Sequence, residues 1–232
     1  MNFKYKSIFI DLDDTLWDIH ANGKEALSET FDQYGLKNLF ASFEEFYDIY
    51  MPNNLNLWAQ YRMGIIRKQE LVLQRFLYPL QLKGINDESL ALKMNADFLE
   101  ATTTKTKLIP YAKEILEYLS PKYRLFILSN GFTEVQYKKL KTSGLSPYFE
   151  KVILSETAEA NKPSPAIFDY APKSTRSRRK ASIMIGDSWE ADIIGAKDSR
   201  IDQIFLNREN KTDLEFQPTY VVESLKEIEG IL

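Results

Sequence analysis

The chain contains no cysteine and a single histidine, His20, among its 232 residues. The absence of cysteine excludes disulfides, thiolate nucleophiles, iron–sulfur clusters and cysteine-based zinc sites. One histidine excludes metal sites built from several imidazoles, and we expect His20 not to be a metal ligand. Any hydrolytic chemistry must therefore depend on carboxylates, hydroxyls and lysine.

The chain also has no large excess of charge of one sign. It contains 30 Lys and Arg and 33 Asp and Glu, which gives a formal net charge of −3. This balance gives no overall field that would attract nucleic acid or an anionic membrane. No apolar run approaches the ~18 residues that a membrane-spanning helix needs, and none fits a signal peptide. We expect a cytoplasmic protein that binds neither nucleic acid nor membrane, as a monomer or a homodimer.

Short apolar runs, each ending at polar residues, recur along the chain. They are Ser7–Ile10, Tyr123–Leu128, Lys151–Leu154, Ala181–Ile185 and Gln203–Leu206, with Thr219–Val222 as a candidate sixth. Such runs are typical of strands buried on both faces. Helical patterns separate them, at Ala112–Leu119, Thr133–Lys141, Trp189–Ala196 and Val222–Leu232. The alternation predicts an α/β fold with a Rossmann-like parallel sheet.

The helix expected at Thr133–Lys141 carries signals at both ends. Thr133-Glu134-Val135-Gln136 fits a capping box, in which the Gln136 side chain would bond the helix start. Lys138, Lys139 and Lys141 fall in the last turn, where cations favour the helix dipole.

One interval breaks the alternation, between the first strand and the next strand–helix unit. Residues 18–104 exceed any ordinary loop and carry apolar residues at helical spacing, which predicts an insertion of about four helices. We therefore expect residues 1–17 and 105–232 to form the α/β core and residues 18–104 a helical cap. Asn22, Asn54 and Trp58 are candidate substrate contacts in this cap, although each residue type is as readily part of a cap core.

The run from Lys173 to Lys180 is the one block of like charge, with basic residues at 173, 176, 178, 179 and 180. It follows Pro172 and precedes an expected strand. We interpret it as a solvated loop between helix and strand, with a nucleic-acid patch as the alternative.

Asp11, Asp13 and Asp14 follow the first expected strand directly. Three carboxylates so close repel one another unless a cation or a proton intervenes. One interpretation is a Mg²⁺ site with a nucleophilic Asp beside an acid/base Asp, since Mg²⁺ prefers oxygen ligands. The alternative is a helix cap or turn, which Asp also favours.

Polar residues follow three further strands in the same way. Ser129-Asn130-Gly131 precedes a helix and fits an anion site, Lys162-Pro163 offers a rigidly placed ammonium, and Gly186-Asp187-Ser188 adds a carboxylate. Asp192, one turn further, can orient Lys162 or a metal-bound water. Each segment alone is also explained as a turn or cap, but the carboxyl ends of parallel strands share one edge, where ligands bind.

These segments resemble the four motifs of the haloacid dehalogenase superfamily, with the insertion where that superfamily places its helical C1 cap. The matching residues are Asp11-x-Asp13-x-Thr15, Leu128-Ser129-Asn130-Gly131, Lys162-Pro163 and Gly186-Asp187-Ser188-x-x-x-Asp192. The stretches Asp14–Asp18 and Asn54–Trp58 resemble the branch that includes pyrimidine 5′-nucleotidases. Asp14, Glu159 and Arg200 stand where many relatives have glycine.

The resemblance implies a phosphatase that acts on a small phosphorylated metabolite, such as a pyrimidine nucleotide. Asp11 would be the nucleophile and Asp13 the acid/base; Mg²⁺ would be held by Asp11, the Asp13 carbonyl and Asp187, with Asp192 behind them. The implied phosphate contacts are Thr15, Ser129, Asn130, Gly131 and Lys162. A phosphosugar phosphatase, a phosphomutase, a haloacid dehalogenase and a non-catalytic binding module remain alternatives.

Overall fold

The computed structural model describes residues 4–232, which divide into two compact units. Of these residues, 4–20 and 106–232 form the first unit, and 21–105 form the second. Asp18, Ile19 and His20, which we expected in the cap, belong to the first unit. Within residues 4–232, no helix is both long and apolar enough to cross a membrane.

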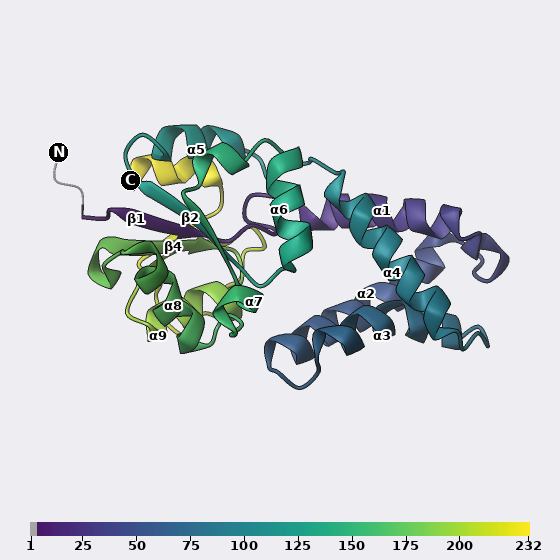
Figure 1. The fold of residues 1–232 in the computed structure, drawn as a ribbon. Coiled ribbons are helices and arrows are strands. Elements are labelled where there is room, and N and C mark those ends of the chain that lie inside the picture. Colours follow the sequence, from purple (N-terminus) through teal and green to yellow (C-terminus); the bar gives the residue numbers. More distant parts are fainter. Residues whose placement is uncertain (1–3) are drawn as a thin grey trace. The chain divides into compact units, whose positions relative to one another are not determined.

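A six-stranded parallel sheet forms the centre of the first unit, in the order β3-β2-β1-β4-β5-β6 (Figure 1). The strands are β1 (Ser7–Ile10), β2 (Arg124–Ser129), β3 (Lys151–Leu154), β4 (Ser182–Gly186), β5 (Asp202–Leu206) and β6 (Tyr220–Val222). The central strand β1 pairs Ile8 with Leu125 on one side and Ile183 on the other. The predicted parallel α/β fold, including the sixth strand, is confirmed.

Both faces of this sheet are buried, as the continuous apolar runs indicated. Ile8 and Ile10 belong to a core cluster with α5 (Ala112–Leu119) and the short helix η5 (Leu225–Gly230). Phe9 points to the other face, into a cluster with α8 (Pro165–Thr175) and α9 (Gly195–Asp198). Alternate side chains of one strand thus support helices on opposite faces.

The second unit is helical. Its elements are α1 (Ile19–Gln33, which begins in the first unit), η1 (Leu36–Asn38), α2 (Phe43–Arg62), α3 (Lys68–Gln81) and α4 (Glu88–Thr103). Ser42 and Asp87 cap α2 and α4 by accepting backbone N–H bonds, which explains where these helices start. An aromatic cluster that includes Phe46, Tyr50 and Phe76 fills the interior. The insertion of four α-helices agrees with the sequence prediction.

Two predicted helices take other forms. The segment after β4 opens as a π-helix, η4 (Trp189–Ile194), before continuing as α9. The C-terminal segment is helical only over Leu225–Gly230, as a 3₁₀-helix, rather than over Val222–Leu232. Val222 instead ends β6, where its backbone carbonyl accepts a hydrogen bond from Asn207.

Candidate active site

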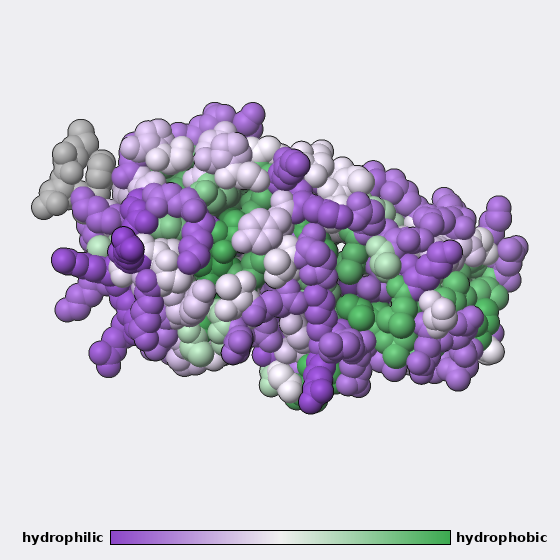
Figure 2. All heavy atoms as spheres, in the orientation of Figure 1, coloured by the Kyte–Doolittle hydropathy of each residue, from purple (hydrophilic) through white to green (hydrophobic). Residues whose placement is uncertain are grey.

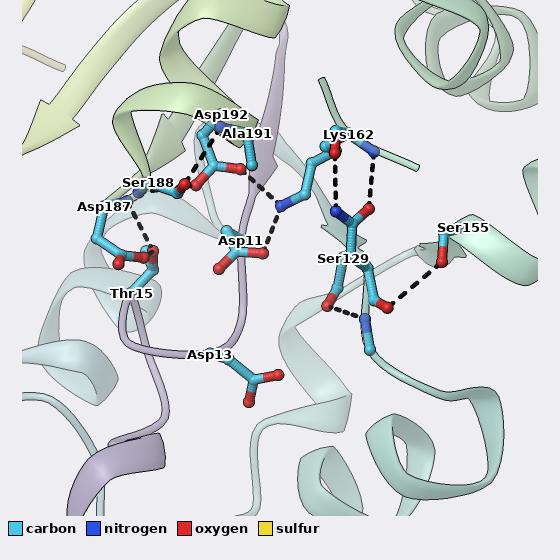
Figure 3. Close-up of polar contacts among 12 residues, drawn as sticks. Asp11, Asp13, Thr15, Ser129, Ser155, Lys162, Asp187, Ser188, Ala191 and Asp192 are labelled. Atoms are coloured by element: carbon cyan, nitrogen blue, oxygen red, sulfur yellow. Dashed lines mark hydrogen bonds and ion pairs between the residues drawn. The ribbon is translucent and has the colours of Figure 1, made fainter. Parts of the chain in front are cut away.

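Polar side chains from four parts of the first unit meet at the carboxyl edge of the sheet (Figure 3). Asp11 follows β1, Ser129 ends β2, and Asp187 follows β4. Lys162 enters from the loop between α7 (Ser155–Ala158) and α8. This is the edge at which open α/β sheets bind ligands.

Lys162 is the centre of the buried charge in this site. Its Nζ lies 2.5 Å from Oδ1 of Asp11 and 2.6 Å from Oδ1 of Asp192, and the lysine side chain is only 3% exposed. Burial alone would lower the pKa of Lys162, but the Asp11 and Asp192 carboxylates outweigh it and raise that pKa. The lysine therefore stays protonated and offsets part of the repulsion between the two carboxylates.

Asn130 fixes the backbone of Lys162. Its Nδ2 donates to the Lys162 carbonyl at 2.9 Å, and its Oδ1 accepts from the Lys162 N–H at 2.8 Å. Both polar ends of the amide are thus engaged with another loop. Asn130, expected as a phosphate contact, joins the loop after β2 to the lysine loop.

Asp187 and Thr15 hold each other between neighbouring loops. The Thr15 hydroxyl donates to Oδ1 of Asp187 at 2.7 Å and accepts from the Asp187 N–H at 3.2 Å. Thr15 is fully buried. This hydroxyl, expected to touch phosphate, orients a carboxylate in the structure.

Asp192 reaches back from the π-helix to the strand end. Its Oδ2 accepts from the Ser188 N–H at 3.2 Å, while its Oδ1 accepts from Lys162. A Cβ at Gly186 would lie 2.3 Å from Oδ2 of Asp192, so only glycine permits this close approach. Gly186 is therefore required by the close packing of the Asp192 side chain against the end of β4.

The carboxylates of Asp11, Asp187 and Asp192 fit a divalent cation. Their oxygens lie within 4.8 Å of one another. Burial, together with neighbouring carboxylates, raises the pKa of both Asp11 and Asp187 to about 7, although Lys162 opposes this for Asp11. Among residues 4–232, no hydrogen bond reaches Oδ2 of Asp11 or Oδ2 of Asp187. Two carboxylate oxygens are thus available to a hard cation, which would relieve the repulsion.

Asp13 lies apart from this group and is held by two residues of α6 (Thr133–Thr142). Lys139 Nζ lies 2.7 Å from Oδ1 of Asp13, and Gln136 Nε2 lies 2.7 Å from Oδ2. The Lys139 side chain is 4% exposed, and its ammonium also lies 4.1 Å from the centre of the Trp17 ring. In Figure 3 the Asp13 side chain points away from Lys162.

The sequence prediction for α6 was wrong on Gln136 and incomplete on Lys139. Gln136 completes no capping box, since the helix starts without a side-chain cap and Thr133 bonds Glu156 instead. Lys139 lies in the last turn, as predicted, and it is also buried. Their shared spacing of three residues places both on one helix face, and this was the signal available in the sequence.

Ser129 and Gly131 are linked to the same helix. The Ser129 hydroxyl accepts from Gln136 Nε2 at 2.9 Å and from the Gly131 N–H at 3.1 Å. A Cβ at Gly131 would lie 1.8 Å from Gln136 Nε2. Glycine at this position therefore leaves the space that Gln136 needs to bond Asp13 and Ser129.

The three residues found in place of glycine share an unusual backbone. Asp14, Glu159 and Arg200 all have positive φ, at 61°, 52° and 59°. Glycine adopts this region without strain, which is a physical reason for glycine to be favoured at these three positions. The Asp14 side chain makes two contacts. Its Oδ2 lies 3.2 Å from His20 Nε2, and its Oδ1 accepts a hydrogen bond from the Ile19 N–H. Burial raises the pKa of Asp14 to about 6, although His20 opposes this shift.

The candidate substrate contacts of the cap belong to the second unit. Asn22 is buried in α1, and Trp58 in α2 packs edge-on against Tyr61. Oδ1 of Asn54 is buried without a hydrogen-bond partner in the described chain. Asn54 thus has unmet hydrogen-bonding capacity, whereas Asn22 fits a core position.

The profile of haloacid dehalogenase-like hydrolases matches residues 5–200, which include every core site residue described above. The chain belongs to this family. The resemblance of the four motifs is thereby confirmed, and with it the expectation of a hydrolytic enzyme.

Two relatives extend the match over nearly the whole chain. The pyrimidine 5′-nucleotidase PynA of Streptococcus pneumoniae is 33% identical, over 97% of this chain and 93% of its own length. The pyrimidine 5′-nucleotidase YjjG of Escherichia coli is 31% identical, over 99% and 98% respectively. The crystal structure of the HAD-hydrolase YfnB of Bacillus subtilis, bound to magnesium, has a TM-score of 0.87 at 28% identity, and the match covers 99% of both chains.

Proposed function

We propose that this enzyme is a Mg²⁺-dependent phosphatase that hydrolyses a small phosphate monoester through an aspartyl-phosphate intermediate. The observation that carries the proposal is the cluster of the Asp11, Asp187 and Asp192 carboxylates, with the buried Lys162 ammonium bound between Asp11 and Asp192. Such a group supplies a nucleophile, ligands for a cation and a positive charge, without cysteine or histidine. A phosphosugar phosphatase, a phosphomutase and a haloacid dehalogenase are the alternative activities that an enzyme of this fold could have.

In the first step, an oxygen of Asp11 forms a bond to phosphorus while the ester P–O bond breaks. Asp13 gives a proton to the leaving oxygen, so the alcohol departs neutral. In the second step, Asp13 takes a proton from water, the water oxygen attacks phosphorus, and the bond to Asp11 breaks. Inorganic phosphate leaves, and both carboxyl groups return to their starting state.

Each step depends on where the chain holds these two carboxylates. Lys162 keeps Asp11 in one orientation through the 2.5 Å contact and favours its ionised, nucleophilic form. Lys139 and Gln136 bind the two oxygens of Asp13 and fix its direction. Lys162 thus positions Asp11 before substrate binds. Asp13 must exchange its bond to Lys139 or Gln136 before it can carry a proton to the leaving oxygen.

The cation proposed for this site is Mg²⁺, with Asp11, the Asp13 carbonyl and Asp187 as its ligands and Asp192 as support for Lys162. When bound, Mg²⁺ would offset the repulsion between the Asp11 carboxylate and the substrate phosphate. YfnB, which was crystallised with magnesium, supports this choice of metal.

Ser129, the Gly131 N–H and the Lys162 ammonium are the proposed contacts of the phosphate oxygens. Asn130 acts through Lys162, whose backbone it binds at both polar atoms. Thr15 acts through Asp187 in the same indirect manner. Most of the catalysis of phosphoryl transfer comes from such positioning and charge stabilisation.

The proposed substrate class is pyrimidine nucleoside 5′-monophosphates, supported by the activity named for PynA and YjjG. The test is phosphate release from nucleoside monophosphates and sugar phosphates, with Mg²⁺ and with EDTA. We expect Mg²⁺-dependent release with the highest kcat/KM for UMP, CMP or dTMP. A preference for sugar phosphates would refute the nucleotide assignment and keep the phosphatase. Transfer of the phosphate within a sugar would indicate a mutase, and halide release from 2-haloacids a dehalogenase.

A further inference from the structure

A cavity lies at the amino edge of the sheet, opposite the candidate active site. Its volume is about 580 Å³, within the range of small-molecule sites. Its lining includes five cationic side chains, those of Lys4, Lys6, Arg124, Arg176 and Arg178. All of these residues belong to the first unit. Figure 2 shows long hydrophilic side chains gathered at this end of the unit, where β1 begins.

The cavity is built on the starts of three neighbouring strands. Lys6 precedes β1, which begins at Ser7; Arg124 begins β2, and Ala181 precedes β4. The Lys6 N–H donates to the Ala181 carbonyl at 2.8 Å, and the Arg124 N–H donates to the Lys6 carbonyl at 3.0 Å. The backbone around the cavity therefore continues the hydrogen bonding of the sheet and is rigid compared with an ordinary surface loop.

The basic run between α8 and β4 is fixed to the same place. The hydroxyls of Ser177 and Ser7 lie 2.8 Å apart, and the Ser177 N–H donates to the Pro172 carbonyl at 2.8 Å. Arg176 and Arg178 flank this anchored serine. Arg176 is the left-handed C-cap of α8, with φ of 54°, and its N–H donates to the Lys173 carbonyl at 3.2 Å. The basic run Lys173–Lys180 contributes no residue to the catalytic site. It brings the guanidinium groups of Arg176 and Arg178 to this cavity.

Within the described part of the chain, three of the five cations have no anionic partner. Lys4 pairs with Asp202, and Arg124 pairs with Glu150. Among residues 4–232, no carboxylate lies within ion-pair distance of Lys6, Arg176 or Arg178. A chain with a net charge of −3 thus concentrates unneutralised positive charge in one small concavity. Arginine pairs match phosphate oxygens well because each guanidinium can donate two parallel hydrogen bonds.

We propose that this cavity binds a small anion that carries two or more phosphoryl groups, with Lys6, Arg176 and Arg178 as its charged contacts. The four residues of β1 separate it from Asp11 by roughly 13 Å at 3.3 Å per residue, so the ligand does not compete with substrate. The cavity is concave and confined to a few residues, which favours a small molecule over the extended contact of a nucleic acid. The proposal is independent of the substrate assigned to the catalytic site.

The test uses the double variant Arg176→Gln/Arg178→Gln and a matched control, Lys173→Gln/Lys180→Gln. The control removes two charges of the same run that do not line the cavity. Binding of inorganic triphosphate is measured by calorimetry in EDTA, so that all three proteins have the same catalytic site without metal. We expect the Arg variant to bind at least about tenfold more weakly than the wild type, and the control to bind within twofold of it. Hydrolytic activity should stay within twofold in both variants.

Equal affinities in the three proteins, an equal loss in the control, or no binding to the wild type would overturn the proposal. A comparison with ATP in EDTA distinguishes the two sources of the ligand. Tighter binding of ATP than of inorganic triphosphate indicates a nucleoside polyphosphate, and equal binding indicates an inorganic one. If a short single-stranded RNA binds more tightly than either, with the same dependence on Arg176 and Arg178, the surface is a nucleic-acid patch and the proposal is wrong.

Discussion

The ammonium of Lys139 lies 2.7 Å from the carboxylate of Asp13, a residue 126 positions earlier in the chain. This contact joins α6 to the loop after β1, and it is buried on the lysine side. Lys139 has no other anionic partner among the described residues. The pair therefore links the position of the proposed acid/base to the packing of one helix.

We expect Lys139→Met to lower kcat by about 10- to 100-fold, with KM changed by less than threefold. The methionine keeps most of the packing against Trp17 but removes the charge that orients Asp13, and an oriented acid/base is worth about 10²- to 10⁴-fold. Steady-state kinetics measure this, with Lys139→Arg as partial rescue. Lys141→Met, an exposed lysine of the same helix, is the control and should be unaffected. An equal loss of kcat in Lys139→Met and Lys141→Met would show that any substitution in α6 lowers activity. It would contradict a specific role for Lys139 in orienting Asp13.

Gly131→Ala should lower kcat by about tenfold, because its Cβ would displace the Gln136 side chain from Asp13 and Ser129. Gln136→Ala should cause a similar loss. The double variant should then be no worse than either single one, since both remove the same interaction. Additive losses in this double-mutant cycle would contradict the mechanism.

Asp187→Asn should stabilise the metal-free protein by at least about 1 kcal/mol, since it removes a buried charge next to Asp11. Asparagine still accepts the Thr15 hydrogen bond. Urea unfolding in EDTA measures this gain. The same variant should lose the rise in melting temperature that Mg²⁺ gives the wild type, because a bound ligand stabilises only a protein that binds it. A Mg²⁺-dependent rise equal to that of the wild type would exclude Asp187 as a ligand.

Glu159→Gly should stabilise the protein by up to about 1 kcal/mol, because glycine removes the cost of the left-handed backbone at this position. Glu159→Ala is the matched control, since it removes the same side chain but keeps the strain. Thermal or urea unfolding of the two variants distinguishes backbone relief from loss of the carboxylate. If alanine stabilises as much as glycine, the strain is not the cause.

The sheet could be predicted from the sequence because its strands are short apolar runs that end at polar residues. The bounds of β1 and β3 agree with the prediction to the residue. The same rule brought Asp11, Ser129 and Asp187 to one edge, since the carboxyl ends of parallel strands coincide. The spacing of residues along the chain was therefore sufficient to predict those site residues whose position depends only on where a strand ends.

The sequence was insufficient where one side chain competes for several partners. Gln136 fits a capping box locally, but in the structure its Nε2 donates to Asp13 and Ser129. Only the packing of α6 on the sheet brings these groups together. Lys139 was interpreted from its place in the last turn, whereas its burial depends on Trp17 and Asp13 from a distant segment. Thr15 and Asn130 likewise bind protein groups whose proximity no local pattern reveals.

The central claim is that Asp11 is the nucleophile of a phosphatase, and one measurement tests it directly. Phosphate release from p-nitrophenyl phosphate and UMP with Mg²⁺ is compared between the wild type and Asp11→Asn. Asparagine has the same shape and can still accept from Lys162, but it is no nucleophile, so we expect a loss of at least about 10³-fold while the fold is retained. Wild-type activity in Asp11→Asn would contradict the account.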